Sequence, residues 1–343
     1  MQEYLPQVFE RFAKEEFRYS SPLYERLSLA IAKDSELLTL AGHGRRGERI
    51  PNLLFAAVHF LLLKGVKHPL RRFYPSLPEF SAEASGPYAD FRSFCMDHAA
   101  EIRQQISARL VQTNEVRRCA GLVPAFEWVR RLAKDRPLHL VDIGTSAGLN
   151  LLWDHYAYEY GTAHRCGELS SLVKIKCALQ GNFIPPIPLT LPQVSARIGL
   201  DLNPLDVHHA EDALWLRALI WPEHRERSGL LEKAIQVVQQ CPPTLLRGDG
   251  VELLPDLMKS VREDEVLCIV RIFTQLPPQS RDRLSALIAG YAGRRDVFMI
   301  TLRPHGGDDS ELHLTSFIDG DKTEWRLAYL QNHGEWIEWV QLG

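Results

Sequence analysis

The sequence has little of what marks several large classes of protein. Its six cysteines include no Cys-x-x-Cys pair, so we expect reduced, structural thiols in the cytoplasm rather than a disulfide framework. His164, Cys166 and Cys177 lie near one another, but their spacing matches no common zinc pattern and predicts no metal site. The longest apolar stretch, residues 53–63, is too short to span a bilayer, and a net charge of −3 provides no basic excess. We therefore expect a cytoplasmic protein with no nucleic-acid or membrane partner.

Two common nucleotide-binding signatures are missing as well. No G-x-x-x-x-G-K-[ST] sequence occurs, which excludes a P-loop. A dinucleotide site requires G-x-G-x-x-G, and here Ser146 stands where the second glycine would let a pyrophosphate approach. Such a site also requires an acid about 20 residues further on, whereas the next acid that ends an apolar run, Asp201, lies much later. These departures argue against a nicotinamide dinucleotide.

Patterning divides the sequence into two parts. Residues 1–112 carry apolar residues at helical spacing and little strand pattern, which predicts an all-α amino-terminal domain. In residues 113–343, short apolar runs alternate with helical patterns, which predicts an α/β domain with a mainly parallel sheet. The expected strands are 138–142, 197–202, 243–246, 265–271 and 296–302, and the expected helices are 147–157, 207–221, 223–240, 251–261 and 278–292.

Two further segments complete this expected fold. Residues 311–318, 323–330 and 335–341 are separated by turn sequences, which predicts antiparallel strands at one edge of the sheet. Residues 158–195 read as an insertion containing a hairpin and a proline-rich extended loop. We expect the helical domain to cover the substrate side of the sheet or to mediate dimerisation.

Residues 138–150 are the most informative stretch of the chain. An apolar run ends at Asp142, Gly144 and Gly148 flank a small polar turn, and an amphipathic run begins at Leu149. A strand, a tight turn and a helix in this order bring unpaired N–H groups together at the turn. That arrangement is typical of a site for the polar end of a nucleotide-like cofactor.

Acids also end the second and third expected strands. Asp201 stands where a carboxylate typically accepts hydrogen bonds from the two hydroxyls of a ribose. Asp249, between Gly248 and Gly250, is placed to accept a hydrogen bond from an adenine amino group. Each acid alone is as well explained as a helix N-cap or a turn residue. Their order on successive strands favours a binding role.

A different enzyme class uses the same turn. Residues 144–148 fit the G-x-S-x-G spacing of a nucleophile elbow, with Ser146 as nucleophile. An α/β-hydrolase then needs a later acid and a histidine, and Asp249 and His305 fall in the required order. This hydrolase is the rival hypothesis.

The order D-x-G-x-x-x-G, G-x-D and G-D over about residues 137–302 resembles class I S-adenosylmethionine-dependent methyltransferases. Longer blocks resemble an uncharacterised bacterial family known only as a domain of unknown function, over nearly the whole chain. These blocks are Val111–Val116, Asp142–Asp154, Gly199–Asp206 and Trp215–Pro222.

The methyltransferase resemblance implies a Rossmann-like domain, S-adenosylmethionine as cofactor, and specific cofactor contacts. Asp201 would contact the ribose and Asp249 the adenine. Thr113 and Asn114 would reach the cofactor carboxylate, although a helix N-cap is the simpler interpretation of Thr113. The methionine end would be lined by residues of the first turn, namely Asp142, Gly144, Thr145, Ser146, Gly148 and Asn150.

The catalytic residues are less evident. Arg271, at the end of the fourth expected strand, either binds an anionic substrate or pairs with a nearby carboxylate. His155 is the nearest candidate general base in sequence, and a surface histidine is the simpler interpretation. His59, within an apolar helix, is expected to be a hydrogen-bonded core residue. The sequence thus favours methyl transfer to a small molecule, with noncatalytic cofactor binding as an alternative.

Overall fold

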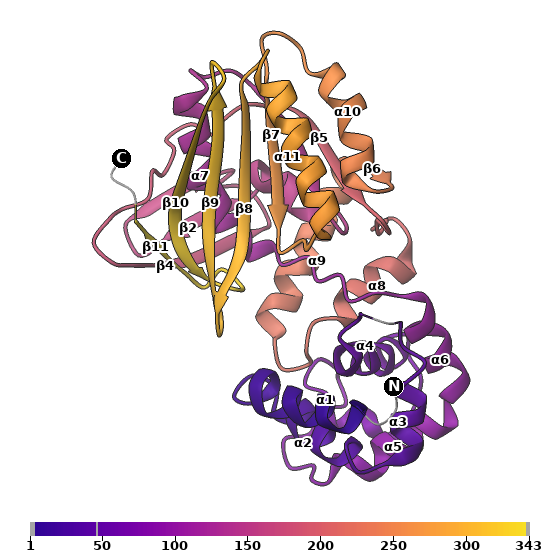
Figure 1. Ribbon diagram of the computed structural model, residues 1–343. Helices are drawn as coiled ribbons and strands as arrows, with labels where there is room; N and C mark the ends of the chain where they lie inside the picture. The colour runs from indigo at the N-terminus through magenta and orange to yellow at the C-terminus, as the bar shows by residue number, and fades with distance from the viewer. Residues whose placement is uncertain (1–3, 46, 341–343) are drawn as a thin grey trace. The chain divides into compact units, whose positions relative to one another are not determined.

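The computed structural model describes residues 4–45 and 47–340, which form two compact units (Figure 1). The first unit comprises Met1–Thr113 and His208–Gly229. The second comprises Asn114–Val207 and Leu230–Gly343. Residues 208–229, which the sequence pattern placed with the sheet, therefore pack with the amino-terminal helices.

The first unit contains helices α1 to α6 and α8. Their starts carry clear signals: Ser21 accepts a hydrogen bond from the Tyr24 N–H ahead of α2, and Asp34 caps α3 in the same way. The elements are α1 (Leu5–Phe12), η2 (Ala13–Phe17), α2 (Pro22–Ile31), α3 (Ser35–Ala41), α4 (Ile50–Leu63), η3 (Pro69–Phe73), α5 (Pro87–Asp97), α6 (Ala99–Ala108) and α8 (Ala210–Ala218). In the part of the chain that the structure describes, no helix combines the length and apolarity needed to cross a membrane.

Aromatic side chains pack within the first unit and join residues 208–229 to its amino-terminal helices. The rings of Tyr24 and Phe55 stack at 4.1 Å, and Phe17 contacts Trp221 at 4.9 Å. His59 is 2% exposed and hydrogen-bonds to Ala218 O at 3.1 Å and to Ser76 Oγ at 2.8 Å. The expected core role of His59 is therefore confirmed, and burial lowers its pKa to about 4, so the ring is neutral.

The second unit is built on one sheet of 11 strands in the order β3-β2-β4-β11-β10-β9-β8-β7-β1-β5-β6. The five strands expected to be parallel neighbours are confirmed, with ends shifted by a few residues. They are β1 (Leu138–Ile143), β5 (Val194–Asp201), β6 (Thr244–Arg247), β7 (Val266–Ile272) and β8 (Val297–Gly306).

The strand order reverses at β1. From β1 the chain adds β5 and then β6 on one side, and it then returns to add β7 and β8 on the other side. In open sheets of this kind, ligands bind outside the carboxyl ends of the strands at the point of reversal. Here that point lies between β1 and β7.

The carboxyl-terminal meander and the insertion form the other half of the sheet. β9 (Asp309–Ile318), β10 (Asp321–Gln331) and β11 (Trp336–Trp339) continue antiparallel from β8, as expected. They do not end the sheet, because the insertion supplies three more strands beyond them: β2 (Ala157–Tyr160), β3 (His164–Gly167) and β4 (Lys174–Gln180). The hairpin β2–β3 was expected, whereas β4, which pairs parallel with both β2 and β11, was not.

Helices cover both faces of the sheet (Figure 1). α10 (Gly250–Ser260) and α11 (Pro278–Ala292) pack on one face over an apolar core that includes Val141, Leu267 and Ile269. α7 (Cys119–Leu132) lies on the other, after the short turn η4 (Val116–Arg118). α9 (Arg225–Gln240) joins the two units along the chain.

The prediction of a helix at residues 147–157 is wrong. Residues 147–157 do not form an α-helix but only η5 (Leu149–His155), a 3₁₀ element of seven residues with non-helical backbone at Leu152. Two tyrosines that follow η5 compete for its carbonyls, because Tyr156 OH and Tyr158 OH donate hydrogen bonds to the carbonyls of Leu149 and Trp153. The macrodipole expected to point at the first turn is correspondingly small.

Two glycine substitutions test the packing of the central strands. A Cβ at Gly199 would lie 2.5 Å from Thr145 Cγ2 and 2.7 Å from Leu245 Cδ2, so Gly199→Ala should destabilise the fold by about 1–3 kcal/mol. Gly290 lies in α11 with nothing within 4 Å, so Gly290→Ala should stabilise by about 0.5–1 kcal/mol. Urea unfolding midpoints measure both, and equal effects would contradict the described packing at Gly199.

Candidate functional site

The carboxyl ends of β1, β5, β6 and β7 meet at one edge of the sheet, and the expected first turn lies there. Gly144 and Gly148 adopt positive φ angles of 84° and 73°, which favour glycine. Ser146 also has a positive φ, 57°, although it carries a side chain. A non-glycine residue in this region costs about 1–3 kcal/mol and is common at functional sites.

Two hydrogen bonds hold Ser146 in this conformation. Its N–H donates to Asp201 Oδ2 at 2.9 Å, and its carbonyl accepts from the Leu205 N–H at 3.1 Å. Asp201 Oδ1 also accepts from the Asn203 N–H at 2.8 Å. The acid expected to bind a ribose thus first joins the turn after β1 to the segment after β5.

Four other N–H groups at the turn have acceptors too. Those of Gly144 and Thr145 donate to Leu200 O, that of Gly148 to Thr145 O, and that of Leu149 to Asn114 Oδ1 at 3.0 Å. These groups were expected to face a ligand, and that expectation is wrong, because neighbouring segments of the chain satisfy them. The turn is therefore fixed before any ligand arrives.

The two glycines of the turn make room for side chains. A Cβ at Gly144 would lie 2.1 Å from Thr274 Oγ1, whose hydroxyl donates to Ile143 O at 2.9 Å. A Cβ at Gly148 would lie 2.9 Å from Pro243 Cγ. Thr274, just after β7, closes the turn from the other side of the reversal point. Thr274 was not among the expected site residues, although a polar residue shortly after a strand is a recognisable signal.

Asp142 is buried beside this turn with only 4% of its surface exposed. Burial raises its pKa to about 7, the neighbouring Thr145 hydroxyl opposes the rise, and the Asp201 carboxylate adds to it by repulsion. The Asp142 and Asp201 carboxyl groups therefore lie close enough together to repel one another. Such a pair attracts a positively charged ligand group.

Asp249 is exposed and begins α10. Its Oδ1 accepts hydrogen bonds from the N–H groups of Val251 at 2.8 Å and Glu252 at 3.3 Å, so it is the helix N-cap. Its Oδ2 has no hydrogen bond within residues 4–45 and 47–340. The capping role and an acceptor role toward a ligand are therefore compatible at this position.

The structure gives the surroundings of three more expected cofactor contacts, Thr113, Asn114 and Asn150. Asn114 reaches the turn but binds the Leu149 N–H. Asn150 is buried and accepts a weak hydrogen bond from Cys119 Sγ at 3.4 Å. Thr113 is half-buried at the end of the first unit and caps no helix, because Glu115 occupies the N-cap of η4. The N-cap interpretation of Thr113 is wrong.

The two catalytic candidates lie apart. Arg271 is half-buried at the carboxyl end of β7, in register with Thr301 of β8. His155 ends η5 and interacts electrostatically with Glu168 of the insertion. Among the described residues, His155 makes no hydrogen bond to the turn.

The arrangement required for a hydrolase does not assemble around Ser146. His305 Nδ1 pairs with Glu311 at 3.1 Å and its ring lies against Tyr329, on β8 to β10. Asp249 caps α10, and the partner of His305 is Glu311 rather than Asp249. Neither residue supplies the contacts that a nucleophilic serine requires.

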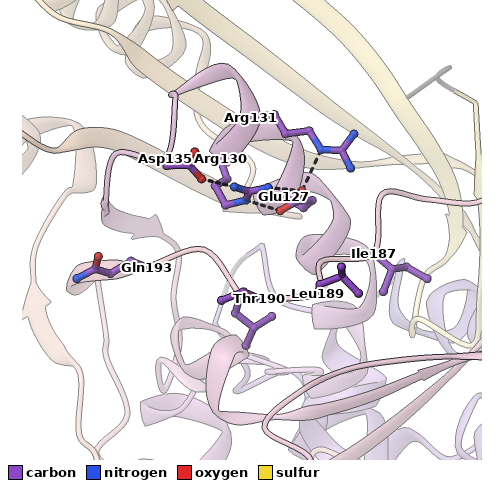
Figure 2. A pocket seen from close by; sticks show the side chains of 9 residues that line it. Glu127, Arg130, Arg131, Asp135, Ile187, Leu189, Thr190 and Gln193 are labelled. Atoms are coloured by element: carbon purple, nitrogen blue, oxygen red, sulfur yellow. Dashed lines mark hydrogen bonds and ion pairs between the residues drawn. The ribbon is translucent and has the colours of Figure 1, made fainter.

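A pocket of about 610 Å³ lies at the opposite ends of the strands (Figure 2). It is lined by the end of α7 and by the extended loop before β5. Figure 2 shows Glu127 held by Arg130 and Arg131 at 2.7–2.9 Å, so the charges within this pocket neutralise one another. Because it lies at the amino-terminal ends of β1 and β5, it is not the expected ligand edge.

Fold and site together define a mixed α/β protein. Its expected ligand edge lies where the strand order of a mainly parallel sheet reverses. Over residues 6–339 the chain matches the family described as "Uncharacterized protein conserved in bacteria (DUF2332)", and it belongs to that family. No curated protein and no solved structure matches it. The family description assigns no activity, so function is argued from the site.

The raised pKa of Asp142 predicts a specific pH dependence of stability. The folded state favours the protonated acid, so this stabilisation is present below the ordinary pKa of 3.8 and is lost as pH rises through about 7. Asp142→Asn cannot titrate and should gain stability over wild type between about pH 5 and pH 8, by up to a few kcal/mol. Urea unfolding across this range measures the difference. The exposed Asp282→Asn serves as control, and a parallel pH profile for wild type and Asp142→Asn would contradict the burial argument.

Proposed function

We propose that this protein binds S-adenosylmethionine at the carboxyl edge of β1, β5 and β6 and transfers its methyl group to a small molecule. The strand order on which the proposal depends runs β6-β5-β1-β7-β8, the doubly wound order of a Rossmann-like sheet. The single observation that carries it is the placement of Asp142, Asp201 and Asp249 at three neighbouring strand ends beside the reversal point.

The charges at this edge fit the cofactor. S-adenosylmethionine carries a sulfonium and an ammonium group, and the adjacent carboxyl groups of Asp142 and Asp201 favour a cation. The uncommitted Oδ2 of Asp249 is an acceptor suited to an adenine amino group. The hydrogen-bonded N–H groups of the first turn do not contribute, so the carboxylates must supply most of the contacts.

The bound cofactor would supply an electrophilic methyl group, and the protein would position the acceptor. Asp201 keeps the turn after β1 fixed through Ser146, so the edge does not reorganise when the cofactor binds. Thr274 holds the start of the segment after β7 against Ile143. Because methyl transfer to an activated nucleophile needs no strong base, the remote position of His155 is compatible with this function.

Calorimetry with S-adenosylmethionine and S-adenosylhomocysteine tests the proposal on the full chain. Asp249→Ser keeps a good N-cap but removes the free carboxylate oxygen, so it should weaken binding about tenfold or more while α10 remains intact. Asp201→Ala should abolish binding. Asp256→Ser, an exposed acid on the same helix, is the matched control and should bind as wild type does.

Three results would contradict the proposal in different ways. No heat with either compound would end it. Binding without turnover over a broad substrate panel would instead indicate a noncatalytic cofactor-binding protein. Covalent labelling of Ser146 by a fluorophosphonate would favour the hydrolase.

A further inference from the structure

A row of polar side chains crosses the sheet beside the proposed cofactor edge. Arg271 of β7 is in register with Thr301 of β8, Thr301 with His313 of β9, and His313 with Arg326 of β10. Residues in register point to the same face of a sheet. Because Arg271 follows Ile269 by two residues, this is the face that α11 covers further along β7.

Two more arginines lie close to Arg271. Arg303 follows Thr301 by two residues on the same face of β8, and Arg281 lies in the first turn of α11. Burial lowers the pKa of Arg271, and repulsion from Arg303 and then from Arg281 lowers it further. Three guanidinium groups therefore converge at the carboxyl ends of β7 and β8.

The carboxylates nearest these three arginines are Glu311, which is in register with Arg303, and Glu324, and both are paired with other side chains. Within residues 4–45 and 47–340, none of them forms an ion pair. Glu311 is held by His305 at 3.1 Å, His313 at 2.9 Å and Arg326 at 3.3 Å. Glu324 interacts electrostatically with Arg303 but is paired with Lys322 at 2.6 Å. Arg271 is half-buried, so its charge without a paired carboxylate is costly unless an anion binds beside it.

We propose that Arg271, Arg281 and Arg303 form a binding site for the phosphate group of a small molecule. A dianion suits three positive charges better than a monoanion, and the planar guanidinium fork matches phosphate oxygens. The buried hydroxyl of Thr301 lies in register beside Arg271 and adds a neutral donor on the same face. That this phosphorylated molecule is the methyl acceptor rests on the proposed function, whereas the anion site itself does not.

Thermal unfolding of the full chain in sodium phosphate, sodium acetate and sodium chloride at equal ionic strength tests the site. Phosphate should raise the wild-type midpoint more than acetate or chloride, by mass action on the folded state. In Arg271→Gln the apparent affinity for phosphate should fall about tenfold or more, and in the exposed Arg303→Gln it should also fall. Arg294→Gln, an exposed arginine beyond the other end of α11, should respond as wild type does.

The chloride series adds a test of opposite sign. Without phosphate, Arg271→Gln should unfold at or above the wild-type midpoint, because the substitution removes the repulsion among the arginines. Equal phosphate shifts in all four proteins would overturn the proposed phosphate site. A larger shift with acetate than with phosphate would overturn the inference that the site prefers a dianion. If Arg271→Gln does not fold, an unchanged response of Arg303→Gln is sufficient to overturn the proposal.

The two proposals fail separately. A phosphate response that depends on Arg271, with no heat on addition of S-adenosylmethionine, would refute methyl transfer and support the anion site. Cofactor binding with equal phosphate shifts in all variants would do the reverse.

Discussion

The hydrogen bond from the Ser146 N–H to Asp201 joins the two central segments of the ligand edge. It fixes a serine in a backbone conformation that side chains rarely adopt, and it orients the carboxylate that ends β5. Thr274 closes the same turn from β7. The edge is thus preorganised by contacts between β1, β5 and β7, and the positions of the remaining polar groups follow from it.

This edge has two electrostatic halves. Asp142, Asp201 and Asp249 end strands on one side of the reversal point, and Arg271 and Arg303 lie on the other side. A cationic cofactor and an anionic substrate would each meet complementary charge there. The division arises because parallel strands present their carboxyl ends at one edge, while the strand order separates residues that follow one another along the chain.

Much of the fold was predictable because hydrophobic periodicity is local. The apolar runs at 138–142, 197–202 and 265–271 are strands, and the helical patterns at 251–261 and 278–292 are helices. The helix predicted at 147–157 does not form. Tyr156 and Tyr158 donate hydrogen bonds to backbone carbonyls that an α-helix would use, and hydrophobic periodicity does not report such contacts. The strand β4 was missed for a similar reason, since its pairing with β11 joins distant segments.

The sequence by itself determined which residue types lie at the strand ends: acids near the ends of β1 and β5 and after β6, and an arginine near the end of β7. Only the tertiary structure decided what those residues contact. It commits most N–H groups of the first turn to Asp201, Asn114 and backbone carbonyls, and among the described residues Arg271 has no carboxylate partner. The physical reason is that hydrogen bonds and ion pairs depend on strand register and order, which bring together residues far apart in the chain.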